Sequence, residues 1–324
     1  MHRPSRMSPE ISVLIPAFRT RHLDLTIASI LAQSYTNFEL IISDDSDGPD
    51  VEDVVSKWSD SRMRYVRNPD RQVPGANRDN LISLAQGRYI KFVFDDDFLL
   101  PQSLEVLEQG ARLLAADLVF HARYFVDECG RRLGEVSVVP AGQAILLDSS
   151  LVFVNMVGGA QNFIGEPSNI MIRADMLREM ANPFGVDGER MRFLTDVALY
   201  LNVAAGGRRL VGTGYTGSAF RLHRGQTSAV GGPAYSAGLF EWELFARWAA
   251  DHGYLDRDSA VAAISARRLS YLPHVDDYPE LFALASVSPD PGPKELFLDQ
   301  EFTAVLRAAW SAVDQRNAQQ KLAA

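Results

Sequence analysis

The sequence predicts an α/β fold, in which a mixed and mostly parallel sheet is flanked by helices and followed by a helical C-terminal region. Three observations predict it. From Ile11 onward, short apolar runs alternate with amphipathic stretches, the pattern of β-α-β units. After Gly231-Gly232-Pro233 the chain becomes rich in alanine and keeps a helical periodicity. A content of 47% hydrophobic and 23% charged residues is that of an ordinary globular protein.

The elements of the first part of the chain follow one another in regular order. Each expected strand is a short run of aliphatic and aromatic residues, and each expected helix repeats apolar residues three or four positions apart. The expected strands are residues 11–15, 38–42, 63–66 and 89–94, and the expected helices are 23–33, 51–58, 80–86 and 101–116.

The later elements are less regular. The apolar runs 118–126 and 133–138 flank a turn and predict an antiparallel hairpin, whereas residues 151–188 are rich in Gly, Asn and Pro and predict a long binding loop. Gly212–Gly217 matches G-x-G-x-x-G but opens no clear helix, so we interpret it as a loop and not as a dinucleotide-binding fingerprint. The remaining expected elements are helices at 193–205, 236–252, 259–271 and 302–318, and strands at 209–211 and 219–222.

Composition excludes several classes of protein. A net charge of -9 argues against a broad basic surface for nucleic acid. The single Cys129 excludes an intramolecular disulfide and a cysteine-based zinc cluster, which favours a reducing cytoplasm. The chain contains no apolar stretch of the ~20 residues that a membrane span requires, although a location at the inner face of the membrane remains open. We expect a flexible tail (1–9), an α/β domain (10–230) and a helical region (231–324) that could mediate a homodimer.

The acidic triplet Asp95-Asp96-Asp97 is the strongest candidate site. Three adjacent carboxylates repel one another, yet apolar residues flank them on both sides. The triplet follows a predicted strand, and the carboxyl edge of an open α/β sheet is where ligand groups are placed. Hard oxygen ligands at such an edge suit Mg²⁺ or Mn²⁺, with a phosphate completing the coordination shell. The alternative is a solvated acidic turn.

Three further clusters follow predicted strands or precede the triplet. Phe18, within Pro16-Ala17-Phe18-Arg19, offers a ring that could stack on a base. Asp45 offers a carboxylate for a base or a ribose, and Arg78 offers a cation. Taken singly, each signal is weak, because an aromatic residue after a strand more often serves packing and an Asp-Asp-Ser turn is common as a helix N-cap. Their convergence on one edge of one sheet indicates a nucleotide site.

At this point the sequence resembles the family 2 glycosyltransferases, which have the Rossmann-like GT-A fold and use nucleotide-diphosphate sugars. The match extends over about residues 10 to 228. The resembling segments are residues 12–18, 29–34, 38–46, 85–90 and 95–101.

The resemblance implies roles for individual residues on the donor side. Phe18 and Asp45 would hold the base, with Pro16, Arg19 and Arg78 also on the nucleotide. Asp95 would take the ribose and Asp96 the metal. Family members usually carry an Asp where this chain has Phe94, so Asp97 could contribute to the metal site.

The resemblance also points to two later elements. Asp196, preceded by Thr195 where relatives often carry Glu, is the candidate general base, and its alternative is a carboxylate at a helix N-terminus. Phe220–Ser228 resembles a mobile loop that closes over the diphosphate. In it Arg221 and Arg224 would neutralise phosphate charge and His223 would ligate the metal; the alternative is a set of exposed cations on a turn. Residues 162–168, with Glu166, resemble an acceptor-side segment.

Together these features predict an inverting, metal-dependent glycosyltransferase of the hexosyltransferase type. It would move a sugar from a nucleotide-diphosphate donor, in this family commonly a UDP-sugar, to a hydroxyl of a glycan, lipid-linked or other acceptor in bacterial polysaccharide or glycoconjugate synthesis. A nucleotidyltransferase is one alternative, although it should carry a Gly-rich basic loop after the first strand. A non-catalytic scaffold is another, motivated by Phe94 and Thr195.

Overall fold

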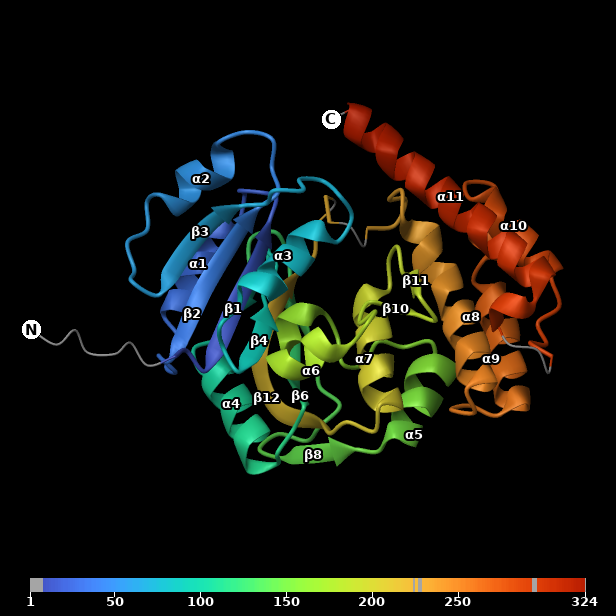
Figure 1. Cartoon of the computed structure of the whole chain (residues 1–324), viewed down its shortest axis with the longest axis horizontal. Coiled ribbons are helices and arrows are strands. Elements are labelled where there is room, and N and C mark those ends of the chain that lie inside the picture. Colours follow the sequence, from blue (N-terminus) through green and yellow to red (C-terminus); the bar gives the residue numbers. More distant parts are fainter. Residues whose placement is uncertain (1–7, 224, 227–228, 293–295, 324) are drawn as a thin grey trace, which may run out of the picture. The chain divides into compact units, whose positions relative to one another are not determined.

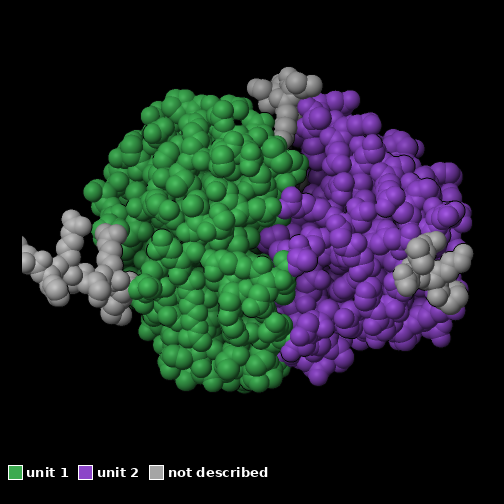
Figure 2. All heavy atoms as spheres, viewed as in Figure 1, with its two compact units in different colours: residues 1–146, 164–180, 208–222 green, residues 147–163, 181–207, 223–324 purple. Residues whose placement is uncertain are grey.

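The computed structural model describes residues 8–223, 225–226, 229–292 and 296–323. Residues 1–7 of the expected tail and the candidate residue Arg224 therefore lie outside the described residues. The chain divides into two compact units, coloured separately in Figure 2. Unit 1 comprises residues 1–146, 164–180 and 208–222, and unit 2 comprises residues 147–163, 181–207 and 223–324.

Unit 1 is built on a mixed sheet of ten strands (Figure 1). The strand order is β3-β2-β1-β4-β9-β6-β12-β5, with β7 paired to β6 and β8 paired to β12. The first four strands pair in parallel, as β-α-β alternation predicts. The strands are β1 (Ile11–Ala17), β2 (Phe38–Asp44), β3 (Met63–Arg67), β4 (Tyr89–Phe92), β5 (Phe98–Leu99), β6 (Leu118–Val126), β7 (Arg132–Val136), β8 (Ala144–Leu147), β9 (Ile170–Arg173) and β12 (Leu210–Arg221).

Helices of unit 1 bury their apolar faces against this sheet. Leu23, Ile27 and Ile30 of the first helix are fully buried in the same core as Val13 and Leu40. This burial removes apolar area from water on both sides of the contact, which is the main stabilising term. The helices are α1 (Leu23–Leu31), α2 (Asp50–Val55), α3 (Ala76–Leu84), α4 (Ser103–Leu113), the 3₁₀ turn η2 (Pro167–Asn169) and α6 (Ala174–Glu179).

Three sequence predictions in this unit were wrong. The expected long loop contains β9, which inserts antiparallel between β4 and β6. Its short apolar run pairs with strands far away in the sequence, so no local pattern marked it. Residues 210–221 form one strand instead of two, because register shifts between Thr213 and Ser218 let a single strand bend. Gly212–Gly217 therefore lies in β12 and not in a loop, while the predicted hairpin is confirmed as β6–β7.

Unit 2 is largely helical, which confirms the expected helical C-terminal region. The helix α8 is buried along nearly its whole length, including two glutamates. The elements are α5 (Ser149–Val152), the π-helix η1 (Phe153–Gly158), β10 (Gly185–Val186), β11 (Glu189–Arg190), α7 (Thr195–Ala205), α8 (Tyr235–Asp251), α9 (Arg257–Leu269), η3 (Leu272–His274), α10 (Pro279–Ser286), η4 (Leu296–Leu298) and α11 (Gln300–Ala323). Within the described part of the chain, no helix combines the length and apolarity that crossing a bilayer requires.

Close approach of two backbones at Gly87 yields a stability prediction. The Gly87 N–H donates to Ser12 Oγ at 2.8 Å, and an added Cβ would lie 2.5 Å from Ser12 N. We expect Gly87→Ala to lower the free energy of unfolding by about 3 kcal/mol, because backbone cannot move aside as a flexible side chain can. Urea unfolding measures the change. Gly134→Ala is the control, since no atom lies within 4 Å of its added Cβ. Equal effects of the two substitutions would contradict the explanation.

Candidate functional site

The acidic triplet follows β4 at the carboxyl edge of the sheet, and its first member ties two loops together. Asp95 is 5% exposed, and its Oδ2 accepts hydrogen bonds from Phe18 N and Arg19 N, both at 2.7 Å. Burial raises the pKa of Asp95 to about 6, while the two N–H donors oppose the shift. The loop after β1 is therefore held to the loop after β4 by one carboxylate.

The last member of the triplet faces inward. Asp97 is 1% exposed, and its carboxylate accepts from Ser168 Oγ at 2.6 Å and from Arg221 N at 3.1 Å. Burial, and then the charge of Asp96, raise the pKa of Asp97 well above its usual range. Both carboxylate oxygens are thus engaged with protein groups, a structural arrangement that the sequence did not suggest.

Asp96 is half-buried and is the least buried member of the triplet. Its main-chain oxygen accepts from Arg221 Nε at 2.9 Å, which holds the backbone of the triplet in place. Mg²⁺ commonly binds through one or two carboxylates together with the phosphates of a substrate. A half-buried acid between two buried ones fits such an ion.

Arg221 differs from its prediction in position and in partners. It is the last residue of β12, not part of a mobile loop, and it is 2% exposed. Its Nη1 donates to the carbonyl oxygens of Asp127 and Glu128 at 3.2 and 3.0 Å. In this structure the guanidinium therefore connects three main-chain carbonyls of unit 1.

The loop after β1 presents an aromatic surface. The Phe18 side chain is 49% exposed, and the Arg19 guanidinium lies 5.8 Å from the centre of its ring. Pro16 is half-buried at the end of β1. An exposed ring on an anchored backbone can stack on a planar ligand with little loss of conformational entropy.

The structure distinguishes the two neighbouring acids at the end of β2. Asp44 is fully buried and accepts from Tyr65 Oη at 2.7 Å, and burial together with this carboxylate raises the pKa of Tyr65 to about 12. Asp45 is half-buried, and its Oδ1 accepts from Asn68 Nδ2 at 2.7 Å. Its main-chain N–H donates to Ala17 O, which joins the ends of β1 and β2.

Two other predicted residues of unit 1 lie on neighbouring elements. Arg78 is on α3, half-buried, with Nε 3.9 Å from Asp79 Oδ1. Glu166 is paired with Arg123, the two side chains approaching to 2.8 Å. Because β1 pairs in parallel with both β2 and β4, the loops after these three strands lie at one edge of the sheet, as the sequence predicted.

The candidate base Asp196 belongs to unit 2 and is the second residue of α7. Asn162 Nδ2 donates to its Oδ2 at 2.8 Å, and Val197 N donates to its Oδ1 at 2.9 Å. These two bonds fix the orientation of a carboxylate that stays half-exposed. His223, also in unit 2, is half-buried, and its main-chain N–H donates to Gln226 Oε1.

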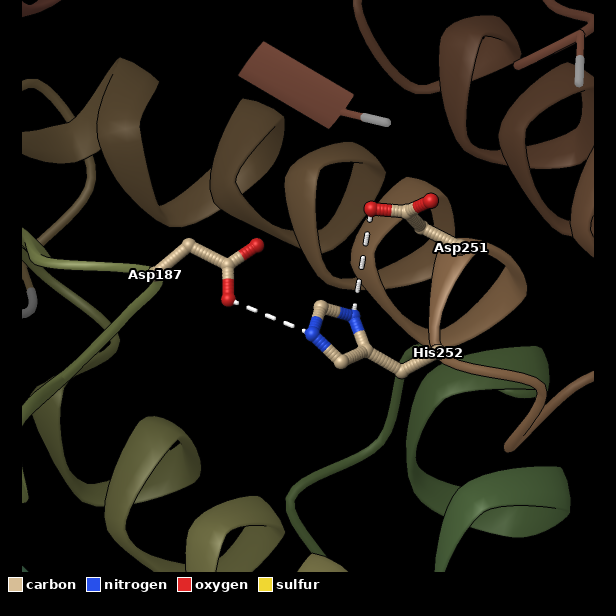
Figure 3. Close-up of side chains that lie close together, drawn as sticks. All are labelled: Asp187, Asp251 and His252. Atoms are coloured by element: carbon tan, nitrogen blue, oxygen red, sulfur yellow. Dashed lines mark ion pairs between the residues drawn. The ribbon is translucent and has the colours of Figure 1, made fainter. Parts of the chain in front are cut away.

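A second group of possible metal ligands was not predicted. Asp187, Asp251 and His252 of unit 2 place one ligand atom each within 4.8 Å of one another (Figure 3). His252 Nε2 lies 3.4 Å from Asp187 Oδ1, and His252 Nδ1 lies 4.0 Å from Asp251 Oδ2. All three residues are exposed, and exposed acidic groups commonly lie together without a bound cation.

Lys91, a buried lysine in the strand that precedes the triplet, was not among the predicted site residues. It lies in β4 at 0% exposure, and its Nζ donates to Ser168 O at 2.6 Å. Ser168 in turn donates to Asp97, so Lys91 ties the segment before β9 to the triplet. A lysine inside the apolar run Tyr89-Ile90-Lys91-Phe92 was the available signal.

Burial lowers the pKa of Lys91 to about 7, against the opposing charge of Asp97. An unfolded lysine titrates near 10.5, so between these two values the unfolded chain binds more protons and stability rises with pH. We expect the free energy of unfolding to increase by about 2 kcal/mol between pH 7 and pH 9 from this group alone.

Urea unfolding at both pH values, on the wild type and on Lys91→Met, isolates that contribution. The variant should lack the increase, whereas Lys57→Met, at an exposed lysine of the same unit, should retain it. A Lys91→Met protein with the full wild-type pH dependence would show that another group titrates.

Comparison with known proteins bears on the family and the fold of this chain. A glucosyltransferase of Escherichia coli, named UDP-Glc:alpha-D-GlcNAc-diphosphoundecaprenol beta-1,3-glucosyltransferase WfaP, is 25% identical over 222 residues, covering 68% of this chain and 80% of the relative. A GalNAc(5)-diNAcBac-PP-undecaprenol beta-1,3-glucosyltransferase of Campylobacter jejuni is 36% identical over 107 residues, 32% of this chain and 35% of that protein. The chain thus spans about a third of the Campylobacter relative.

Solved structures agree with the fold. The crystal structure of Staphylococcus aureus TarS 1–349 in complex with UDP-GlcNAc superposes with a TM-score of 0.59 at 14% identity, covering 95% of this chain and 83% of that chain. This likeness supports the GT-A fold. The family described as Glycosyl transferase family 2 matches residues 12–180, more than half of the 324 residues. The chain therefore belongs to the family 2 glycosyltransferases.

Proposed function

We propose that this glycosyltransferase transfers a sugar from a UDP-sugar to an acceptor hydroxyl, with inversion at the anomeric carbon and with the help of a divalent cation. The observation that supports the proposal most directly is the Asp95 carboxylate, which holds Phe18 N and Arg19 N. It anchors the loop that carries the exposed aromatic ring to the loop that carries the acids. Such preorganisation reduces the entropy lost on binding a nucleotide.

On the donor side, the Phe18 ring would stack on the base and Asp45 would accept a hydrogen bond from it. Pro16, Arg19 and Arg78 would line the same nucleotide site. The anchored position of Asp95 favours an indirect role for it, in which it holds Phe18 and Arg19 and contacts the ribose through its second oxygen.

On the diphosphate side, we assign the cation-binding carboxylate to Asp96. Asp97, predicted as a second ligand, has both carboxylate oxygens hydrogen-bonded to protein groups. It would hold the backbone next to Asp96 in place. A bound Mg²⁺ or Mn²⁺ would offset the negative charge that develops on the departing diphosphate. His223 remains a proposed ligand, and Arg221 would act by holding the Asp96 backbone.

On the acceptor side, Asp196 would remove the proton of the attacking hydroxyl as the bond to the anomeric carbon forms. Direct attack from the side opposite the leaving UDP inverts the configuration. The E. coli and C. jejuni relatives are named for undecaprenol-linked acceptors, so we propose a lipid-linked acceptor and a role in bacterial polysaccharide synthesis. The enzyme would then work as a peripheral protein at the membrane surface.

Isothermal titration of UDP, GDP and dTDP, with and without Mn²⁺, tests the donor side. We expect Mn²⁺ to tighten UDP binding at least about ten-fold, because two unit charges at close range gain several kcal/mol in a partly desolvated site. GDP and dTDP should bind more weakly. If Mn²⁺ strengthens the binding of none of the three nucleotides, the proposal of a metal-bound nucleotide diphosphate is wrong.

A further inference from the structure

A fully buried glutamate in unit 2 binds the segment of chain that precedes the proposed base. Glu241 lies on α8 at 0% exposure. Its Oε1 accepts from Arg192 N at 2.6 Å, and its Oε2 accepts from Phe193 N at 3.1 Å and Leu194 N at 2.7 Å. A fourth donor, Trp310 Nε1 of α11, lies 3.1 Å from Oε1. One carboxylate therefore holds three consecutive main-chain amides.

Those amides immediately precede α7. The first N–H groups of a helix have no partner within the helix and normally need a capping side chain. Leu194, at the N-cap position of α7, makes no such side-chain bond. Glu241 supplies acceptors to this segment from another helix. Because Asp196 is the second residue of α7, the direction of its side chain depends on how this first turn is held.

The helices around Glu241 hold the same segment through side chains. The Arg192 guanidinium stacks on the Trp310 ring at 4.6 Å and lies 3.3 Å from Asp314 on α11. On α8, a Cβ at Gly238 would approach the Phe193 ring to 2.8 Å, so the ring packs directly on the helix backbone. The helices α8 and α11 thus position residues 192–194 by polar and apolar contacts together.

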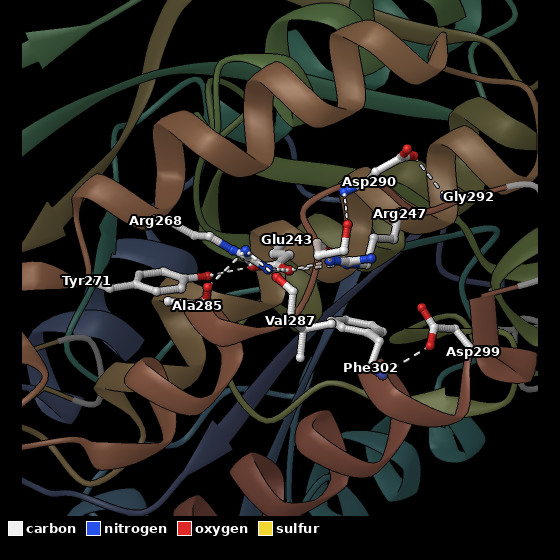
Figure 4. A network of polar contacts seen from close by, with 11 residues as sticks. Glu243, Arg247, Arg268, Tyr271, Ala285, Val287, Asp290, Gly292, Asp299 and Phe302 are labelled. Carbon is white, nitrogen blue, oxygen red and sulfur yellow. Dashed lines mark hydrogen bonds and ion pairs between the residues drawn. The ribbon is translucent and has the colours of Figure 1, made fainter.

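The same helix provides an internal comparison. Glu243, two residues further along α8, is 1% exposed and accepts from Arg247, Arg268 and Tyr271 (Figure 4). Residues two apart on a helix point to different faces. Glu243 therefore ties α8 to α9 and makes no bond to residues 192–194 among the described contacts. The two glutamates match in burial and differ in what they hold.

We propose that Glu241 is a positioning residue for catalysis, which fixes the first turn of α7 so that Asp196 faces the acceptor hydroxyl. This inference rests on the proposed role of Asp196 as general base. It gives the C-terminal helices α8 and α11 a specific task, the support of the base. Asn162, which donates to Asp196 Oδ2, would orient the carboxylate itself, whereas Glu241 orients the backbone that carries it.

The test compares Glu241→Gln with Glu243→Gln in the full-length chain. The side chain of the introduced glutamine keeps the shape of the glutamate. Its NH₂ group, however, would lie against the main-chain N–H donors. We expect Glu241→Gln to lower kcat between about ten- and a hundred-fold, since a displacement of about 1 Å at a reacting group costs that much. The KM for the UDP-sugar should stay within about two-fold of the wild type, because donor contacts are unchanged. Release of UDP from UDP-glucose or UDP-GlcNAc, with water as the acceptor of the sugar, measures both constants.

Glu243→Gln should lower the melting temperature by about as much as Glu241→Gln does. It should keep kcat within about two-fold of the wild type. A third variant, Trp310→Phe, keeps an aromatic ring and removes one donor to Glu241, so a smaller fall in kcat at unchanged KM is expected. Equal falls in kcat for the two glutamate variants, or wild-type kcat in both Glu241→Gln and Trp310→Phe, would overturn the inference. Full activity of Asp196→Asn would instead remove the base assignment on which it rests.

Discussion

Replacement of Asp196 by Asn is expected to lower kcat about a thousand-fold, the usual contribution of a positioned general base. The amide keeps the size of the side chain and can still accept from Asn162 or Val197, but it cannot take the proton of the acceptor hydroxyl. Donor binding should remain as in the wild type. Single-turnover release of UDP measures the chemical step, and titration with UDP and Mn²⁺ measures donor binding.

Asp258→Asn is the matched control for this substitution. Asp258 is the second residue of α9, in the same unit, as Asp196 is the second residue of α7. Each carboxylate interacts favourably with the N-terminal end of its helix dipole, worth about 0.3–1 kcal/mol. Both variants should therefore lose similar stability, and only Asp196→Asn should lose turnover. Turnover that persists in Asp196→Asn would show that another group accepts the proton.

Replacement of Asp96 by Asn is expected to remove the strengthening of UDP binding by Mn²⁺. The amide offers one neutral oxygen in place of a charged carboxylate, which weakens the site for a hard divalent cation. We expect the Mn²⁺-dependent affinity to fall about a hundred-fold, equivalent to roughly 3 kcal/mol. Affinity for UDP without metal should change little, because Phe18 and Asp45 would supply those contacts. Calorimetric titration with a series of Mn²⁺ concentrations gives both values.

The control here is Asp70→Asn, an exposed acid in the same unit. It reports the effect of removing one negative charge on the general attraction of Mn²⁺ to unit 1. Asp97→Asn offers a further distinction, since it should lower stability through the lost acceptors for Ser168 and Arg221. An Asp96→Asn protein with undiminished Mn²⁺ enhancement would place the cation elsewhere.

Much of the fold could be predicted because the signal is local. Apolar runs of four to seven residues separated by amphipathic stretches indicate strands and helices, and β-α-β order then indicates parallel pairing. This reasoning located β1 to β4 and the C-terminal helices α8, α9 and α11 correctly, but it missed α10. It failed for β9, whose three-residue apolar run is stable only through its pairing with β4 and β6. It failed again for β12, which runs as one strand through its glycine and threonine positions with register shifts between Thr213 and Ser218.

The sequence located the candidate loops but not the orientation of each acid within them. Nothing in the run Asp95-Asp96-Asp97 distinguishes its members, and Asp44 and Asp45 are equally alike in sequence. The structure distinguishes them through partners far along the chain, such as Phe18, which is 77 residues from Asp95. Buried charges need such partners, because a carboxylate removed from water without them costs several kcal/mol.

The amino-acid sequence by itself determined the family, the parallel first half of the sheet, and the placement of acids and an aromatic residue after its strands, since these follow from short-range patterns. Only the tertiary structure decided that Asp95 and Asp97 are held inside while Asp96 is only half-buried, that Arg221 connects main-chain carbonyls, and that Glu241 supports the turn before Asp196. Each of these depends on hydrogen bonds between segments that become neighbours when the chain is folded. Burial makes those bonds obligatory, because an unpaired polar group away from water is too costly to persist.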